Sequence, residues 1–253
     1  MVIGDGIFIL IGSFFLIALV YASVGFGGGS SYLALLAQPV FHLLPEVIRP
    51  TALLCNIVVV TGGTILFYRD KKIVWKEVWP FLVASVPMAY LGGLWKLSDH
   101  IFFVILGITL VLASVFLWIQ PRGDDGENRR FNNMAANMGL GGGIGFLSGL
   151  VSIGGGIFLS PVLHFLHWSE VKKISALASL FILVNSISGL AGQFQRGLPN
   201  LQASYIIPLL LAVLAGGQLG SWLGARKFNP LYIKRITALL ILITGLNILK
   251  DHL

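Results

Sequence analysis

Two glycine triplets flanked by serines are the residues of this sequence whose types and spacing best suit a binding site. They are Gly27-Gly28-Gly29, followed by Ser30, and Gly154-Gly155-Gly156, preceded by Ser152. A glycine inside a helix costs about 1 kcal/mol relative to alanine, so we expect a helix to break at each triplet. A helix that restarts after such a break directs free N–H groups and its positive dipole end at the gap, which favours an anion.

Other chemistries fit these residues less well. No Lys-Ser or Lys-Thr pair follows Gly29, which argues against a nucleotide-binding loop. The sequence has no cluster of carboxylates and histidines that predicts a metal site, and nothing in it indicates a cofactor. A serine–histidine dyad of Ser30 or Ser152 with His164 is the alternative that an embedded enzyme would require.

Polar residues inside apolar stretches give a second set of candidates. Four fall early or midway in the segments that follow the two breaks, and we expect them to bind substrate: Thr51, Asn56, Ser179 and Asn185. Three arginines, Arg49, Arg69 and Arg196, are candidates for an electrostatic funnel that attracts anions. The alternatives are hydrogen bonds between helices for the four polar residues and placement at the membrane interface for the arginines.

The elements that position these residues are predicted to cross a lipid bilayer. The chain of 253 residues is 56% hydrophobic and only 11% charged, against roughly 25% charged residues in an ordinary soluble domain. Its apolar runs are Ile7–Ala37, Thr51–Tyr68, Val78–Trp95, Ile101–Ile119, Met134–Leu166, Ile174–Phe194, Ala203–Ala225 and Ile236–Leu249. A span needs about 20 apolar residues, so the fold class is an all-α polytopic membrane protein. The two glycine breaks fall inside the two runs that are too long for one span.

An internal repeat divides the chain into two homologous halves of four segments each. Gly27 to Gly29 recur 127 residues later as Gly154 to Gly156, and Thr61-Gly62 recurs as Ser188-Gly189 at the same offset. We therefore expect a first transmembrane repeat at 1–119, a polar linker at 120–133 and a second repeat at 134–253, which together form one membrane domain.

The basic residues favour halves of opposite orientation. If every run crossed the membrane fully, the 17 Lys and Arg residues would divide almost evenly between the two sides. If each glycine-broken run instead enters and returns, only four remain outside: Arg49, Lys96, Arg196 and Lys250. The other 13 then face the cytoplasm, which is the usual bias. The sequence thus predicts inverted repeats with re-entrant first segments and both termini outside.

The same residues resemble a known family. The pattern Gly25-x-Gly27-Gly28-Gly29, the pattern Ser152-x-Gly154-Gly155-Gly156 with Pro161, and the stretch Ala176–Phe181 are similar to the TauE/SafE family of sulfite and organosulfonate permeases. The resemblance covers about residues 7–250. Ala34 stands where the counterpart of Pro161 would be, so the first half lacks that proline. The resemblance implies a multi-pass protein of the bacterial inner membrane that moves small sulfur-containing anions.

Together these observations predict an alternating-access transporter, not an enzyme, with its substrate between the two breaks. The expected partners are a small anion of the sulfite or sulfonate class and the lipid bilayer; a nucleic acid is not expected, and homo-oligomerisation stays open. A channel-like anion pore is the main alternative. A membrane-embedded enzyme and a membrane subunit without transport activity of its own are the others.

Overall fold

The computed structural model describes residues 3–23, 25–119, 133–197, 201–224 and 230–252, and these residues are almost entirely helical. The α-helices within them are α1 (Ile3–Ser23), α2 (Gly29–Leu36), α3 (Pro45–Arg69), α4 (Trp75–Leu94), α5 (Asp99–Ile119), α6 (Met134–Val151), α7 (Gly156–Phe165), α8 (Val171–Gln195), α9 (Ala203–Gly224) and α10 (Pro230–His252). One short 3-10 helix, η1 (Pro39–Phe41), follows α2. The expected all-helical fold class is confirmed.

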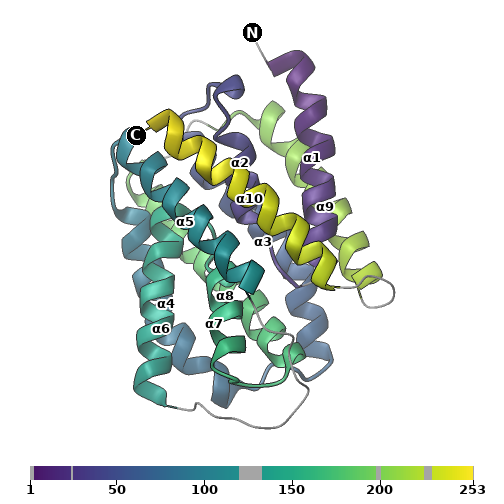
Figure 1. Cartoon of the computed structure of the whole chain (residues 1–253), viewed down its shortest axis with the longest axis vertical. Helices are drawn as coiled ribbons and strands as arrows, with labels where there is room; N and C mark the ends of the chain where they lie inside the picture. The colour runs from purple at the N-terminus through teal and green to yellow at the C-terminus, as the bar shows by residue number, and fades with distance from the viewer. Residues whose placement is uncertain (1–2, 24, 120–132, 198–200, 225–229, 253) are drawn as a thin grey trace.

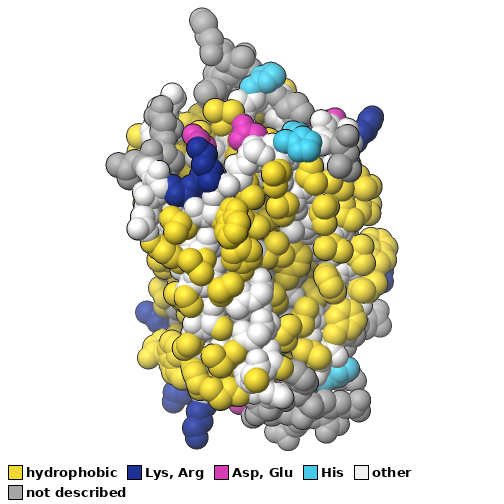
Figure 2. Space-filling view, turned by 90° about the vertical axis from the view of Figure 1, so that its left-hand side faces the viewer, with side chains coloured by type: hydrophobic (Ala, Val, Ile, Leu, Met, Phe, Trp, Pro, Cys, Tyr) yellow, Lys and Arg dark blue, Asp and Glu magenta, His cyan; other side chains and the backbone are white. Residues whose placement is uncertain are grey.

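Seven of the described helices are long and apolar enough to cross a membrane. They comprise Gly6–Ser23, Pro45–Arg69, Trp75–Leu94, Asp99–Ile119, Met134–Val151, Val171–Gln195 and Ala203–Leu223. Figure 2 shows hydrophobic side chains over the middle of one face, with Lys and Arg side chains mostly toward its ends. Phe8, Ile9 and Leu16 of α1 are 75%, 66% and 60% exposed, which suits contact with lipid rather than water. The protein is therefore an integral, multi-pass membrane protein.

Several helices begin earlier than their apolar runs suggest, and α3 and α10 each do so by six residues. Helix α3 starts at Pro45, six residues before Thr51, with proline in its first turn and Glu46 beside it. Proline suits that position because the first N–H groups of a helix have no partner within it, and an acidic residue there complements the helix dipole. Helix α8 starts at Val171 in place of Ile174. Hydrophobicity marks the part of a helix that lies in lipid and misses the polar turn that precedes it.

Both overlong runs are divided where the glycines predicted. Helix α1 ends at Ser23 and α2 begins at Gly29, while α6 ends at Val151 and α7 begins at Gly156. The residue that precedes each short helix is a left-handed glycine, Gly28 with φ 85° and Gly155 with φ 80°. Gly25 and Ser152, also 127 residues apart, have φ values of 82° and 68°. The two breaks thus share backbone conformations that L side chains disfavour.

Most helix pairs join one half of the chain to the other. Helix α4 packs along α6, and α1 packs along α9; α5 packs against α10, and α3 against α8. In Figure 1, α5 and α10 cross the front of the molecule, and both ends of the chain lie at its upper end. Helix α2 contacts α10, and α7 contacts α5. Exchanging the two halves maps α4–α6 onto α1–α9 and α2–α10 onto α5–α7, and it maps α5–α10 and α3–α8 onto themselves.

Glycines allow the closest of these approaches. Gly141, Gly145 and Gly149 lie at four-residue intervals on α6, and a Cβ atom at any of them would overlap the backbone of α4. Small residues at this spacing let helix backbones approach closely in a membrane. Helix α6 is therefore held against α4 over two turns that lead directly to the second break.

Charged side chains from different helices meet at two places. Lys72, after α3, lies 3.4 Å from the carboxylate of Glu170, before α8. Arg49, Lys96 and Arg196 line one cavity. The re-entrant arrangement expected from the sequence places Lys72 and Glu170 on the same side of the membrane, and the orientation of the two halves stays a prediction. Of the proposed linker at 120–133, only Asn133 lies within the described residues, where its side chain accepts hydrogen bonds from the first N–H groups of α6.

Candidate functional site: the two helix breaks

The first break lies between α1 and α2, and the first turn of α2 carries the hydroxyl groups of Ser30 and Ser31. Ser30 is buried in the first turn of α2. The hydroxyl of Tyr21, on α1, lies 2.7 Å from Ser31 Oγ and 3.4 Å from Ser30 Oγ. These contacts hold the end of α1 against the start of α2. Ser30 was expected at this site, whereas Tyr21 was not, since an aromatic residue in an apolar run has no distinctive signal.

The second break exposes a series of unpaired backbone donors. The Ser152 N–H still bonds to the Ser148 carbonyl at 2.7 Å and ends α6. From there, no described group accepts a hydrogen bond from the N–H of Ile153, Gly154, Gly155 or Gly156, and the next bond starts at Phe158. Helix α7 thus begins with free donors directed into the protein interior, the arrangement that binds anions at helix N-termini.

Asn56 of α3 joins the two breaks. Its side chain is fully buried, and its Nδ2 donates to the Ile153 carbonyl of the second break at 3.1 Å. A Cβ atom placed on Gly27 would lie 2.5 Å from Asn56 Oδ1, and one on Gly154 would lie 2.8 Å from Nδ2. Gly29 is closer still to this amide. The glycines of both breaks therefore meet at one side chain, which only residues without a Cβ atom allow.

Further buried polar atoms near the second break have no hydrogen-bond partner within the described residues. Asn56 Oδ1 is one, since its amide nitrogen is already oriented toward Ile153. Others are Ser148 Oγ, Ser186 Oγ and Asn185 Oδ1. Ser186 Oγ lies 3.2 Å from the position of a Cβ on Gly154. Buried polar atoms without partners are rare in proteins, and a cluster of them marks a place for water or a ligand.

Thr51 and Ser179 make other contacts. Thr51 Oγ1 donates to the Val47 carbonyl of its own helix at 2.6 Å. Ser179 Oγ lies 2.9 Å from Thr64 Oγ1, so it links α8 to α3. Neither hydroxyl is bonded to a break. Ser179 was preferred to Ser186 for its position early in the segment that follows the break. Both lie in one uniformly apolar helix, whose pattern does not show which face meets the break.

The three arginines divide between the two ends of the molecule. Arg49 is only 5% exposed; its Nε donates to Ser152 Oγ at 3.3 Å and its Nη2 to the Gly149 carbonyl at 3.4 Å. Arg196 Nη1 donates to the Trp95 carbonyl at 3.1 Å. Arg69 is exposed at the opposite end of α3, which is about 37 Å long. Arg49 and Arg196 thus lie at one end of the molecule and Arg69 at the other.

Gln193 of α8 also contacts the second break. Its Nε2 donates to Ser152 Oγ at 2.9 Å, so this hydroxyl receives hydrogen bonds from both Gln193 and Arg49. Gln193 was not among the predicted site residues. The sequence feature that could have indicated Gln193 is its position one turn before Arg196, near the end of an apolar run.

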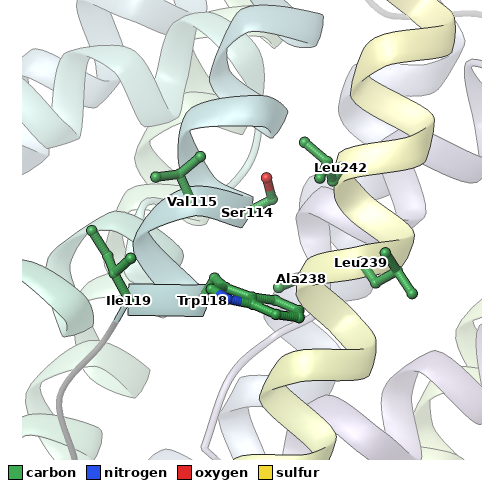
Figure 3. A pocket seen from close by; sticks show the side chains of 7 residues that line it. All are labelled: Ser114, Val115, Trp118, Ile119, Ala238, Leu239 and Leu242. Carbon is green, nitrogen blue, oxygen red and sulfur yellow. The ribbon is translucent and has the colours of Figure 1, made fainter.

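A second hollow lies between α5 and α10 and is chemically different (Figure 3). It has a volume of about 290 Å³, and Val115, Trp118, Leu239 and Leu242 are among its lining side chains. Its one hydroxyl, that of Ser114, donates to the Val111 carbonyl of its own helix. This hollow suits a lipid chain better than an anion. Within the described residues, no group of three His, Cys, Asp or Glu side chains could hold a metal ion.

Comparison with known proteins shows the family of this chain. The family model described as "Sulfite exporter TauE/SafE" matches residues 10–248. The chain belongs to the TauE/SafE family. This TauE/SafE chain is 32% identical over 242 residues to the probable membrane transporter protein y4hK of Sinorhizobium fredii, covering 94% of this chain and 96% of the relative.

Two relatives from Bacillus subtilis are also similar to this TauE/SafE chain. The probable membrane transporter protein YunE is 25% identical over 253 residues, covering 90% of this chain and 92% of the relative. The probable membrane transporter protein YjnA is 26% identical over 246 residues, covering 89% of this chain and 92% of the relative. No solved structure matches. The family and these names identify the chain as a membrane transporter.

Proposed function

We propose that this TauE/SafE chain transports small sulfur-containing anions, such as sulfite or organosulfonates, and binds them between the two helix breaks. The observation that carries the proposal is the convergence of both breaks on Asn56. Gly27 and Gly29 contact its amide from one side, while Gly154 contacts it and Ile153 accepts its hydrogen bond from the other. The breaks therefore form one site rather than two.

The chemistry of this site favours an oxyanion. The free N–H groups of Gly154, Gly155 and Gly156 lie at the positive end of α7, and the unpartnered hydroxyls of Ser148 and Ser186 can donate as well. Among the described residues, Arg49 is the only Lys, Arg, Asp or Glu that is buried. No buried carboxylate among the described residues opposes an anion. The choice of sulfur rests on the family description.

The partners of Asn56 add a restriction on the ligand. Its Oδ1 accepts no hydrogen bond from the described residues, and neither does Asn185 Oδ1. A bound oxyanion leaves these acceptors unsatisfied unless water or a proton on the anion reaches them. A hydrated or singly protonated anion therefore fits the site better than a dry, fully ionised one.

We also propose that transport proceeds by alternating access between inverted halves. Several observations support this: the exchange pattern of helix pairs, the repeated left-handed residues at Gly28 and Gly155, and the contact between Lys72 and Glu170. Transporters with inverted repeats bind substrate near the midplane, on discontinuous helices. The breaks would then remain a fixed centre while the surrounding helices open to one side or the other.

Flux measurements in proteoliposomes test this function. We expect saturable uptake of labelled sulfite or methanesulfonate by the wild-type chain, and at least about a tenfold loss with Asn56→Leu, because the substitution removes about 1.4 kcal/mol or more of polar interaction. Asn247→Leu, at an exposed asparagine of α10, is the matched control and should retain full uptake.

The form of the flux separates the alternatives. Saturation with slow turnover supports a carrier, whereas ionic conductance without saturation supports a channel-like pore. Absence of flux for every small anion tested would contradict transport through this site and return the embedded enzyme and the inactive subunit to consideration.

A further inference from the structure

Arg49 presents an electrostatic problem that the contacts within the protein do not resolve. Its guanidinium is 5% exposed and forms no ion pair with a described carboxylate. Its hydrogen bonds, to Ser152 Oγ at 3.3 Å and to the Gly149 carbonyl at 3.4 Å, are both long. The ring of Phe102 lies 5.7 Å from its Cζ atom. A guanidinium carries five N–H donors, so most of its bonding capacity and all of its charge are uncompensated.

The cavity beside Arg49 has the size and charge to supply the missing anion. Its volume is about 190 Å³, and two of its lining side chains, Arg49 and Gln193, are buried and polar. Its rim is exposed and carries four charged residues: Lys96, Arg196, Glu46 and Asp99. Three basic residues against two acidic ones leave one net positive charge. This balance selects a monovalent anion and disfavours cations.

We propose that this cavity is a second anion-binding site, occupied before the helix breaks, with Arg49 as its principal ligand and Gln193 beside it. The planar guanidinium can bond two oxygens of one ligand in parallel, so the site takes an oxyanion such as a sulfite or a sulfonate rather than a halide. Arg49 would do more than attract an anion from a distance, because an anion can pair with a buried guanidinium only by contacting it directly.

The position of Arg49 links this cavity to the second break. The guanidinium and Gln193 both donate to Ser152 Oγ, and Ser152 is the left-handed residue that ends α6. An anion that bonds the unused donors of Arg49 draws the guanidinium toward the cavity and away from Ser152 Oγ and the Gly149 carbonyl, to which its hydrogen bonds are already long. Occupancy of the cavity therefore loosens the contact that fixes the end of α6, next to the free N–H groups of the break.

Anion binding to the purified full-length chain in detergent tests the proposal. The probes are methanesulfonate and sulfite with chloride for comparison, and the readout is the shift of the thermal unfolding midpoint with anion concentration. We expect both oxyanions to stabilise the wild type and chloride to be far weaker. Arg49→Lys keeps the positive charge but loses the planar guanidinium that bonds two oxygens in parallel. It should raise the half-saturating oxyanion concentration at least tenfold. Lys76→Gln, at an exposed lysine near the other end of the molecule, should have no effect.

Two further variants separate anion binding in the cavity from misfolding and from anion binding at the breaks. Lys96→Glu lies on the exposed rim, where folding is not at risk, and should leave only the stabilisation that anion binding at the breaks supplies, because the net lining charge of the cavity becomes negative. Gly155→Leu should retain the part of the stabilisation that depends on Arg49, since this substitution damages the break alone. Stabilisation that survives both Arg49→Lys and Lys96→Glu but disappears in Gly155→Leu would overturn the second site while leaving the proposed transport site intact. Binding that depends on Arg49 in a chain without anion flux would leave the second site standing and overturn the transport proposal.

Discussion

Gly28 and Gly155 hold the backbone conformations from which α2 and α7 begin. Their φ values of 85° and 80° cost an L residue about 1–2 kcal/mol each, before any steric overlap. At Gly155 a Cβ atom would also lie 2.8 Å from the ring of Phe181. We expect Gly28→Leu and Gly155→Leu each to reduce anion flux by about tenfold or more, since the free N–H groups would be displaced.

The matched control for these substitutions is Gly143→Leu on α6. Gly143 is exposed, and a Cβ atom there would meet nothing within 4 Å. All three variants should insert into the membrane at wild-type levels, as measured by the yield of protein in washed membranes. Normal flux in both break variants would remove the glycine breaks from the mechanism.

Sequence reasoning located the residues whose chemistry is local and missed those defined by packing. The glycine triplets and Asn56 stand out because such residues are costly inside an apolar helix. Ser148 and Ser186 lie at the second break, but α8 is apolar on every side, so no periodicity distinguishes the face that carries Ser186 from the face that carries Ser179. Arg49 was expected to attract anions from a distance; its burial depends on α6 and α8, which lie far away in sequence.

At the scale of the helices, α6 packs closely against α4 over the two turns that precede the second break. A Cβ atom on Gly145 would lie 2.6 Å from the Ser85 carbonyl oxygen and 2.7 Å from Ser85 Cα. Backbone atoms in the middle of a helix cannot move aside as a side chain can. Gly145→Leu should therefore destabilise the chain by about 1–3 kcal/mol.

A thermal unfolding scan in detergent measures this effect. The midpoint of Gly145→Leu should fall by several degrees, and that of Gly143→Leu, two residues away on the exposed side of the same helix, should stay within about a degree of the wild type. Equal midpoints for the two variants would show that the contact between α4 and α6 tolerates more separation than its geometry implies.

The helices themselves were largely predictable because hydrophobicity is the dominant signal in lipid. Each apolar run corresponds to a helix or, for the two longest, to a pair of helices divided at the glycines. The starts of several helices, α3, α8 and α10 among them, were misplaced, since polar first turns are governed by proline, charge and capping rather than by hydrophobicity. The partners of each helix were not predictable, because uniformly apolar surfaces do not specify which neighbour they contact.

For the whole molecule, the orientation of the two halves can be tested with single cysteines. The chain has one cysteine, the buried Cys55, which Cys55→Ala removes. In that background, Lys96→Cys should react with a membrane-impermeant maleimide in intact cells, while Lys72→Cys should react only after the cells are opened. Lys96 is exposed near the start of α3, and Lys72 follows its end, about 37 Å away.

A paired experiment controls for accessibility. Lys72→Cys combined with Glu170→Cys should be joined by a short bifunctional maleimide, because the native side chains are 3.4 Å apart. Lys96→Cys combined with Glu170→Cys should not. Labelling of Lys72→Cys from outside, or cross-linking of the second pair, would rule out inverted halves with re-entrant first segments.

The pairing of α4 with α6 and of α1 with α9 has a consequence for synthesis. When the ribosome has completed α5, the faces of α1, α4 and α5 that will contact the second half have no protein neighbour. Lipid must cover them until the later helices arrive, and the glycines of α6 find the backbone of α4 only then. The first half is thus inserted before its packing is complete, and the proposed anion site forms only after the second break has been synthesised.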